Sequence, residues 1–344
     1  MTSAYEILAQ LKRTASGPMT EARGAEPAFY WNEEVASAEE NAIFRHDWVC
    51  PGLALEIPDV GDYLTFSIAG EPVFSIRDSS GEIKTYANIC RHRMMQLLQG
   101  RGRTSRVTCP YHAWSYNLQG QLVGAGHMNH SAGFDKTKIC LPQIRTEIWN
   151  GWIYITLNPD AQSMKKALAP LNDVVARYGM EHYVAVLNEE HVWQTNWKLL
   201  TENFMEGYHL PVAHKATVGA WFTPNKTVFP DQSYDSFTYQ TFAKTHAARY
   251  GQAHPDNTRL TGEWRNTSIL PTVFPTHMYV LAPDHLWYLS LRPRGVGAVD
   301  VRFGVAIAPE VDAMLTDTAE RAAWIRDLVV FFEHVNGEDR HVVE

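Results

Sequence analysis

Four residues in two short segments have the types and the spacing of metal ligands. Cys90-Arg91-His92 is followed, after sixteen residues, by Cys109-Pro110-Tyr111-His112. Two thiolates and two imidazoles can hold zinc or an iron–sulfur cluster. Zinc ribbons and fingers usually pair Cys with Cys and His with His, whereas each segment here supplies one of each. This pattern favours a [2Fe–2S] cluster with Cys90 and Cys109 on one iron and His92 and His112 on the other.

A second group of candidate ligands lies in the second half of the chain. His209 and His214 are five residues apart, which places them about 140° apart on a regular helix, so they would not converge there. Pro211 lies between them, and a helix bent at that proline could bring both rings to one metal. Two histidines and one carboxylate form the ligand set of non-haem Fe(II) oxygenases.

Both groups of residues resemble one family. Cys109–Tyr116, followed by Gly120, and Cys90–Arg93 closely resemble the two cluster loops of Rieske domains in ring-hydroxylating-type oxygenases. The segment Asn196–His214 resembles the mononuclear-iron motif of the same family. Its pattern is Asn, a carboxylate, Tyr-His, and a second His five residues later. The resemblance extends from about Glu33 to the end of the chain.

The resemblance implies a role for each matching residue. Cys90, His92, Cys109 and His112 would bind the Rieske cluster, and His209 and His214 would bind the iron. Asn203 and Glu206 would be catalytic, with Glu206 linking the two metal centres. The third iron ligand of the family is an Asp near the C-terminus, commonly in an acidic pair after a helix. We carry that role to Asp339, with Glu338 and Asp327 as the alternatives.

Cofactors and partners follow from the same resemblance. A [2Fe–2S] Rieske cluster would pass single electrons to a mononuclear Fe(II), where O2 and a small organic substrate meet. NAD(P)H would act indirectly, through a flavin and iron–sulfur reductase, with or without a ferredoxin, because the sequence has no Gly-x-Gly-x-x-Gly stretch. The family further implies a homotrimer in which one subunit's cluster faces its neighbour's iron. Whether a small second subunit joins it stays open.

The predicted substrate class depends on Glu206. Aromatic-ring dioxygenases of the family carry Asp there, and Glu resembles the branch that acts on betaines and carnitine. Hydroxylation of an N-methyl group would then release formaldehyde and a demethylated amine. A trimethylammonium group favours a cage of aromatic rings, for which the candidates are Trp221, Phe222, Tyr239, Phe242, Phe274, Tyr279, Trp287 and Tyr288. Arg292 and Arg294 are candidates for holding a substrate carboxylate.

Three other functions compete with this interpretation. Hydroxylation of an aromatic acid or hydrocarbon is the alternative within the family, by mono- or dioxygenation. An electron carrier of the Rieske ferredoxin type would need only residues 43–157, and the second half of the chain argues against it. A zinc-binding interaction module would be colourless. Metal analysis separates these classes, because an oxygenase would hold one iron more than a carrier.

The candidate ligands must be positioned by strands and helices. The order of the strands and helices expected along the chain predicts an α+β fold in three parts. Residues 1–43 form a lead-in, with a helix near Tyr5–Arg13, that packs on the catalytic domain. Residues 44–157 form the all-β Rieske domain, with a hairpin turn at Asp78–Gly81 and a closing strand over Trp149–Leu157. Residues 158–344 form a helix-grip-like catalytic domain with an antiparallel sheet.

In the third part, several strands and three helical stretches are predicted, the first of these helices over Met164–Tyr178. Trp197–Ala220 is helix-like but interrupted at Pro211. Asp317 caps the last helix, and Gly337 is predicted to end it. The strands are expected at Val184–Trp193, Ser268–Phe274, Met278–Leu281, His285–Leu291 and Val299–Ala308.

Composition excludes several classes of protein. The formal charge of −8 at pH 7 argues against nucleic acid or an anionic membrane as partner. No run approaches 18 apolar residues, so we expect no membrane span. The start of the chain does not look like a secretory signal, and four cysteines are too few for a disulfide scaffold, so we expect a cytoplasmic protein. Cys50 and Cys140 have no partner at ligand spacing and are expected to be buried.

Overall fold

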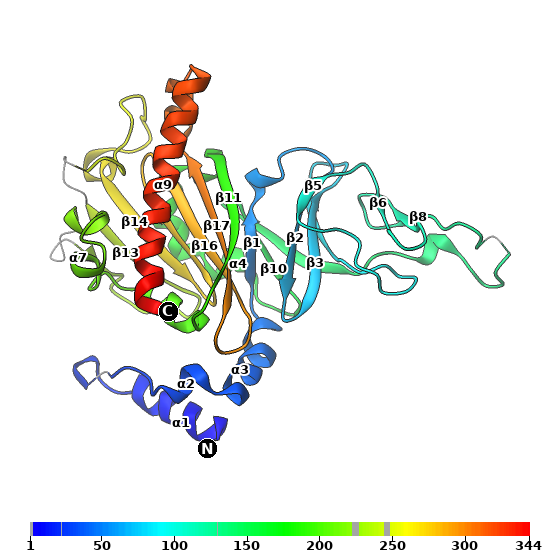
Figure 1. Cartoon of the computed structure of the whole chain (residues 1–344), viewed down its shortest axis with the longest axis horizontal. Helices are drawn as coiled ribbons and strands as arrows, with labels where there is room; N and C mark the ends of the chain where they lie inside the picture. The colour runs from blue at the N-terminus through cyan, green and yellow to red at the C-terminus, as the bar shows by residue number, and fades with distance from the viewer. Residues whose placement is uncertain (1–2, 22, 129, 222–226, 244–247) are drawn as a thin grey trace. The chain divides into compact units, whose positions relative to one another are not determined.

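The computed structural model describes residues 3–21, 23–128, 130–221, 227–243 and 248–344. The chain divides into two compact units (Figure 1). The β unit is Phe44–Lys166, and the mixed unit combines Met1–Ile43 with Ala167–Glu344. The first is built on sheets and the second on a sheet with helices, which confirms the predicted α+β class.

The β unit contains a seven-stranded antiparallel sheet and a three-stranded one. The large sheet has the order β1 (Val49–Leu53), β10 (Trp152–Thr156), β9 (Gln143–Trp149), β4 (Ile83–Ala87), β3 (Glu71–Arg77), β2 (Asp62–Ile68), β5 (Arg101–Arg103). The small sheet consists of β6 (Val107–Thr108), β7 (Ser115–Tyr116) and β8 (Leu122–Gly124). The predicted Asp78–Gly81 turn joins β3 to β4.

Two predictions for the β unit are wrong. Trp149–Leu157 is not one strand, because Asn150 and Gly151 form a tight turn between β9 and β10, with φ of 46° and 84°. An Asn-Gly pair favours these left-handed conformations in a two-residue hairpin loop. Cys50 is buried as expected, but Cys140 is exposed.

The mixed unit is organised around a second seven-stranded antiparallel sheet. Its order is β11 (Val184–Trp193), β17 (Val299–Ile307), β16 (His285–Pro293), β15 (His277–Leu281), β14 (Thr267–Val273), β13 (Phe237–Ala243), β12 (Thr227–Val228). All five predicted strands are present within two residues of their expected ends. Every residue of β15 is buried, as are the first seven of β16, so the centre of this sheet forms the core of the unit.

The long helix α9 (Thr318–Val343) lies across one face of this sheet (Figure 1). Asp317 caps it as predicted, by accepting hydrogen bonds from the backbone N–H groups of Ala319 and Glu320. The prediction that Gly337 ends the helix is wrong. Asn336 and Asp339 on either side are buried, so packing continues through the glycine and outweighs its roughly 1 kcal/mol lower helix propensity.

Within the mixed unit, a buried ion pair attaches the N-terminal segment, residues 3–43, to the part that contains the sheet. It contains α1 (Ala4–Ala15), α2 (Ala28–Trp31) and α3 (Glu33–Glu39). The Glu39 carboxylate accepts hydrogen bonds from the Lys198 ammonium at 2.6 Å and from the Trp197 indole N–H at 3.1 Å. Both donors begin α6 (Trp197–Phe204), so the segment supports the helix that leads into the candidate iron motif.

The break in the predicted stretch Trp197–Ala220 does not fall at Pro211. Helix α6 ends at Phe204, and a separate short helix, α7, spans Leu210–Ala213. Pro211 sits in the first turn of α7, where the missing N–H of proline is tolerated. The chain is interrupted earlier because the Glu206 side chain accepts hydrogen bonds from the backbone N–H groups of Tyr208 and His209.

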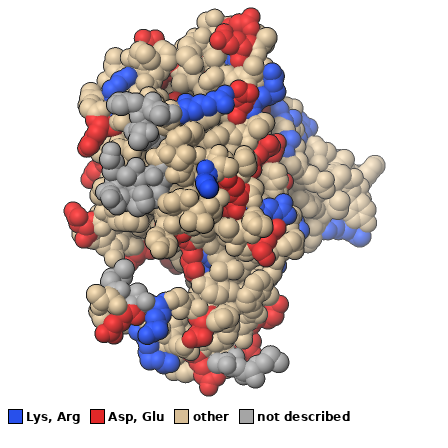
Figure 2. All heavy atoms as spheres, turned by 60° about the vertical axis from the view of Figure 1, so that its left-hand side comes forward, with Lys and Arg blue, Asp and Glu red and all other residues tan. Residues whose placement is uncertain are grey.

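The remaining helices are short. They are α4 (Met164–Ala167), α5 (Ala169–Val175) and α8 (Pro309–Met314). Among the described residues, no helix is both long enough and apolar enough to span a membrane. On the face that Figure 2 shows, acidic and basic side chains are scattered among uncharged ones.

Candidate metal centres

The loops that carry Cys90 and Cys109 share one backbone design. In each loop, the N–H of the cysteine donates to the carbonyl group five residues later, at 2.8 Å in both cases. The residue four positions after each cysteine, Met94 or Ala113, has a left-handed φ of 56° and donates its N–H back to the cysteine carbonyl. Two matching tight loops can present two Cys–His pairs to one cluster.

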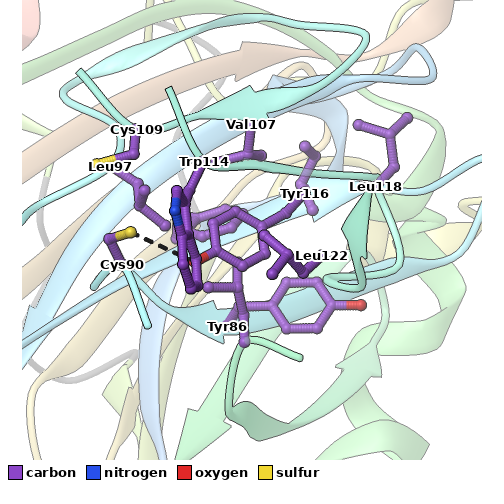
Figure 3. Packing of buried hydrophobic residues seen from close by; sticks show 12 residues of the cluster. Tyr86, Cys90, Leu97, Val107, Cys109, Trp114, Tyr116, Leu118 and Leu122 are labelled. Carbon is purple, nitrogen blue, oxygen red and sulfur yellow. Dashed lines mark hydrogen bonds between the residues drawn. The ribbon is translucent and has the colours of Figure 1, made fainter. Parts of the chain in front are cut away.

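The two candidate cysteine ligands are buried and the two candidate histidine ligands are exposed, as expected for one cluster with Cys ligands at one end and His ligands at the other. Cys90 and Cys109 are 0% and 3% exposed and lie at the edge of an apolar cluster (Figure 3). His92 and His112 are exposed, and their ring centroids are 4.8 Å apart. Buried thiolates and outward imidazoles fit a [2Fe–2S] group with its Cys-bound iron inside and its His-bound iron toward solvent.

Two aromatic residues contact these ligands. The Tyr116 hydroxyl lies 3.3 Å from the Cys90 sulfur (Figure 3), and the Trp114 ring stacks on the His92 ring at 4.8 Å. Burial and the contact with Cys90 raise the pKa of Tyr116 well above its usual range, so its hydroxyl keeps the proton that it can donate to sulfur. Such hydrogen bonds tune cluster potentials. The sequence motif contains both residues but does not reveal these contacts.

In the mixed unit, three side chains converge from two helical regions. His209 and His214 flank α7 at its two ends, and Asp339 projects from α9. One ligand atom from each of the three lies within 4.8 Å of the others. The Asp339 Oδ1 atom is 2.9 Å from the Nε2 atom of His214 and 3.6 Å from that of His209.

Both histidines are oriented by a glutamate on the opposite side of the ring. The Nδ1 atom of His209 contacts a Glu206 carboxylate oxygen, and the Nδ1 atom of His214 lies 2.9 Å from Glu338 Oε2. These bonds turn each Nε2 toward Asp339, as carboxylates that bind the outer nitrogen of a metal-ligating histidine do. Asn203 donates its amide N–H to Asp339 Oδ1 at 2.7 Å.

The two alternatives for the third ligand occupy other positions. Glu338 faces the Nδ1 side of His214 and also accepts a hydrogen bond from the Thr217 hydroxyl. Asp327 pairs with Arg249 at the surface, at 2.7 Å. Of the three acidic candidates, only Asp339 joins the two Nε2 atoms.

The charges at this site depend on one another. Burial alone would raise the pKa of Asp339, but hydrogen bonds from His209, His214 and Asn203 lower it to about 2. Burial would lower the pKa of both histidines, and their carboxylate neighbours raise it instead. The site therefore keeps an ionised carboxylate beside two imidazoles. This donor set fits the facial triad of a non-haem Fe(II) site.

The triad borders a pocket that is partly open to solvent. The sheet supplies Phe242, Leu270, Val280 and Trp287 as one wall, and α9 supplies Phe331, Phe332 and Val335 as another. The aromatic rings contact one another, as Trp221 stacks on Phe331 at 5.5 Å and Phe204 meets Trp287 edge-on at 5.8 Å. Such a pocket suits a ligand with an apolar or cationic surface.

Three of the eight predicted cage residues line this pocket, namely Trp221, Phe242 and Trp287. Tyr239, Tyr279 and Tyr288 are not among the lining residues, nor is Phe274, which is 41% exposed; Phe222 lies outside the described residues. Five further lining residues were not predicted from the sequence, namely Phe204, Tyr250, His285, Phe331 and Phe332. The spacing of Phe331/Phe332 and Val335 before Asp339 on one helix could have indicated the α9 wall.

The proposed carboxylate-binding arginines also lie elsewhere. The Arg294 guanidinium pairs with Asp300 at 2.8 Å, and that of Arg292 pairs with Glu190 at 3.2 Å. Neither arginine is among the pocket-lining residues.

Two family models match the chain. The Rieske [2Fe–2S] domain matches residues 47–141, and the ring hydroxylating alpha subunit catalytic domain matches residues 180–344. Curated relatives are similar over part of the chain. The glycine betaine monooxygenase oxygenase subunit of Chromohalobacter salexigens is 33% identical over 218 residues, which are 62% of this chain and 49% of the relative. The carnitine monooxygenase oxygenase subunit of Escherichia coli (strain K12) is 33% identical over 189 residues, which are 54% of this chain and 50% of the relative.

Solved structures share the fold over more of the chain. A quaternary ammonium Rieske monooxygenase described in connection with carnitine oxidation superposes with a TM-score of 0.77 at 23% identity, covering 92% of this chain and 82% of the other. The structure of naphthalene 1,2-dioxygenase from Rhodococcus sp. bound to indole superposes with a TM-score of 0.75 at 26% identity, covering 89% of this chain and 78% of the other. The chain spans about half the length of the curated relatives it matches.

Proposed function

This chain belongs to the Rieske oxygenases of the ring-hydroxylating type, and from that premise we propose that it is the terminal component of an oxygenase system. It would use O2 and electrons from a reductase to hydroxylate an organic substrate. The observation that carries this proposal is the convergence of His209, His214 and Asp339 beside an aromatic pocket, in a chain that also carries a Rieske domain.

In this proposal, each residue of the iron site has a stated task. His209, His214 and Asp339 hold the metal, and Fe(II) in such a set supplies O2 chemistry beside the substrate. Glu206 fixes the ring of His209, and Asn203 fixes the carboxylate of Asp339 through its amide N–H. The aromatic walls of the pocket would limit the access of water to the reacting groups.

Cys90, Cys109, His92 and His112 are proposed to hold the [2Fe–2S] cluster, which supplies single electrons. Tyr116 and Trp114 then tune it through their contacts with Cys90 and His92. A carrier function alone would leave the triad and the pocket of the mixed unit unexplained.

For the substrate we propose a quaternary ammonium compound. Among the pocket-lining residues that the structure describes there is no Lys or Arg, whereas Glu206 and Asp339 are acidic. An aromatic pocket with acidic groups favours a cation. Insertion of one oxygen atom from O2 into a C–H bond of an N-methyl group, with two electrons and two protons reducing the other atom to water, would give an N-hydroxymethyl group. Its collapse releases formaldehyde and the demethylated amine. The C. salexigens and E. coli relatives support this choice by what they act on.

Ring hydroxylation is the second candidate. The rings of the pocket contact one another over most of its walls, and such walls also suit a flat aromatic substrate. The naphthalene 1,2-dioxygenase structure holds indole, which supports this candidate.

We also propose that the chain works as a homotrimer. Tyr111 next to His112 is 56% exposed, and Tyr208 next to His209 is 94% exposed, so each candidate metal site is flanked by a large exposed ring. An interface between subunits would bury such rings. Glu206 would then bond His209 and, across the interface, a Rieske histidine, His92 or His112. A flavin and iron–sulfur reductase that draws on NAD(P)H is the proposed partner, and the cytoplasm the proposed location.

The proposal is tested by supplying the purified holoenzyme with a competent reductase, NADH and a panel of betaines, carnitine and aromatic acids. We expect O2 uptake and formaldehyde release in equal amounts with a trimethylammonium compound, and neither with the Asp339→Ala variant. Conversion of an aromatic compound to a phenol or diol, without response to any betaine, would favour the second candidate. A cluster that is reduced normally but supports no oxygen uptake with any compound would indicate an electron carrier.

A further inference from the structure

One tyrosine of the N-terminal segment binds helix α6 at both of its ends. The backbone carbonyl of Tyr30 accepts a hydrogen bond at 2.7 Å from the side-chain amide of Asn196, the N-cap residue of α6. The Tyr30 hydroxyl donates to Glu202 Oε2 at 2.7 Å, near the other end of the helix. Burial and the contact with Glu202 raise the pKa of Tyr30 above its usual range, so the hydroxyl keeps the proton that it donates. Tyr30 is buried and holds α6 at two points roughly 9 Å apart along the helix axis.

The residue after Glu202 is the one through which α6 reaches the iron site. Asn203 donates its side-chain N–H to Asp339 Oδ1 at 2.7 Å, and the same oxygen lies 2.9 Å from His214 Nε2. Successive residues of a helix point about 100° apart, so the Glu202 side chain meets the N-terminal segment while that of Asn203 meets α9. A rotation of α6 that broke one of these hydrogen bonds would also displace the other.

Helix α6 depends on its neighbours for its position. It contains only eight residues, and isolated helices of that length are not stable in water. In its first turn Lys198 binds Glu39 at 2.6 Å. At its end Gln240 Nε2 donates to the Phe204 carbonyl at 3.2 Å. Of the three residues that hold the helix in this way, Tyr30 alone contacts it both at its start and near its end.

We propose that Tyr30 is a positioning residue of the iron site. Acting through Glu202, it sets the orientation of α6 and thereby the hydrogen bond from Asn203 to Asp339. The inference rests on the proposed function, because it takes the triad around Asp339 as the iron site. It gives the N-terminal segment a task in that site, although none of its residues lines the described pocket.

The test measures the affinity of the mononuclear site for Fe(II), by chelator competition, in protein whose Rieske cluster is intact. Asn203→Ala removes the hydrogen bond to the ligand itself and should lower the affinity by about 10- to 100-fold. Tyr30→Phe should lower it by about 3- to 10-fold, the equivalent of one ordinary hydrogen bond. In the Asn203→Ala background, Tyr30→Phe should lower it further by less than about twofold, because its effect is transmitted through Asn203.

Tyr178→Phe is the matched control. The Tyr178 hydroxyl is buried in the same unit and donates to the Thr267 carbonyl at 2.7 Å, so the substitution removes a similar hydrogen bond away from α6. It should leave the affinity for Fe(II) unchanged. From the other side of the contact, Glu202→Leu should reproduce the loss seen in Tyr30→Phe, which covers the case that the latter does not fold. Glu202→Gln keeps an acceptor and should restore most of the affinity.

Unchanged Fe(II) affinity in both Tyr30→Phe and Glu202→Leu overturns the proposal. An equal loss in Tyr178→Phe also overturns it, as does a loss of the same size with and without Asn203, since Tyr30 would then act through overall stability. A parent that binds no Fe(II) refutes the proposed function, and this inference with it. A parent that binds Fe(II) no more tightly than its Tyr30 and Glu202 variants refutes the inference alone.

Discussion

Asp339 and Glu338 are neighbours on α9 with different tasks in the proposed iron site. Asp339 meets the Nε2 atoms of both histidines, and Glu338 meets the Nδ1 atom of His214. A direct ligand and a residue that orients a ligand differ in how much metal affinity each contributes, and this difference can be measured.

Asp339→Ala should remove most of the mononuclear iron, because it deletes one of three ligands. Glu338→Ala should lower iron affinity by about 10- to 100-fold, the range seen when an orienting partner is removed. Iron analysis against free Fe(II) concentration measures both effects, and the visible spectrum of the Rieske cluster should be unchanged in each variant. If Asp339→Ala keeps its iron and Glu338→Ala loses it, the two roles have been exchanged.

Glu206 is predicted to couple the two metal centres in addition to orienting His209. Glu206→Ala, saturated with iron, should oxidise its prereduced Rieske cluster far more slowly than the parent when substrate and O2 are added. Glu206→Asp keeps the charge but is one methylene shorter, so partial activity is expected. Single-turnover spectroscopy of the cluster gives the rates.

Glu338→Ala serves as the matched control for Glu206→Ala. It also removes a carboxylate from the Nδ1 side of an iron-site histidine, but Glu338 is not proposed to reach another subunit. Equal rates of cluster oxidation in the Glu206 and Glu338 variants would show that Glu206 only orients its histidine.

The candidate metal ligands could be identified from the sequence, whereas most of the residues that contact them could not. Spacing alone marked Cys90, His92, Cys109 and His112, because two short Cys–His pairs are rare without a metal. The resemblance pointed to Asp339, which the structure places with His209 and His214. The task of Glu338 and the place of His285 depend on contacts between segments far apart in the chain, and no local pattern encodes those contacts.

Helix α7 and the turn after it hold His214 through a close backbone approach at Gly219. The Gly219 N–H donates to the His214 carbonyl at 2.9 Å. A Cβ atom on this glycine would lie 2.3 Å from the Leu210 carbonyl oxygen and 2.7 Å from that of His214. Side chains cannot occupy such space, so this turn requires glycine.

Gly219→Ala should therefore displace the backbone at His214 and lower iron content, while the Rieske spectrum persists. Gly337→Ala is the control, because a Cβ atom there meets nothing within 4 Å and the residue is inside α9. It should raise the free energy of unfolding by up to about 1 kcal/mol. Denaturant unfolding and iron analysis of both variants check this. Full iron in Gly219→Ala would show that the turn can relax.

Strands and helices with a regular hydrophobic pattern were predicted close to their observed bounds. The residues at which helices are interrupted or end were not. The five strands predicted for the mixed unit contain apolar or alternating segments, and Asp317 gives α9 a clear start. The Glu206 side chain binds the backbone, so the interruption between α6 and α7 lies there. The buried residues on either side of Gly337 keep α9 helical at that glycine. Both effects depend on the folded environment and override the preferences of proline and glycine.

The whole molecule combines two compact units with one candidate metal group each. Because a Rieske domain and a catalytic domain occur in one chain, the contents of the two proposed metal sites can be tested together. Treatment with an Fe(II) chelator should remove one iron per chain and leave the red-brown Rieske chromophore, because the Cys-bound end of the cluster is buried. Loss of colour at the same rate as the iron would contradict separate sites.

The proposed trimer can be tested at the exposed ring beside His209. Tyr208→Glu should weaken the assembly measured by analytical ultracentrifugation and slow cluster oxidation, while both metals remain bound. Tyr5→Glu on α1, where the side chain is 81% exposed, introduces the same charge at another exposed tyrosine and serves as the control. Equal assembly and rates in the two variants would place the subunit contact elsewhere.

Helix α9 carries Asp339 at the iron site and Phe331 and Phe332 in the pocket wall. A shift of the helix at one of these points would move the other, so we expect occupancy of the pocket and occupancy of the iron site to be thermodynamically linked. By reciprocity, the factor by which iron changes affinity for a pocket ligand equals the factor by which that ligand changes affinity for iron. Under the proposed function, the affinity of the site for iron would therefore depend on whether the pocket holds a substrate, before any electron arrives.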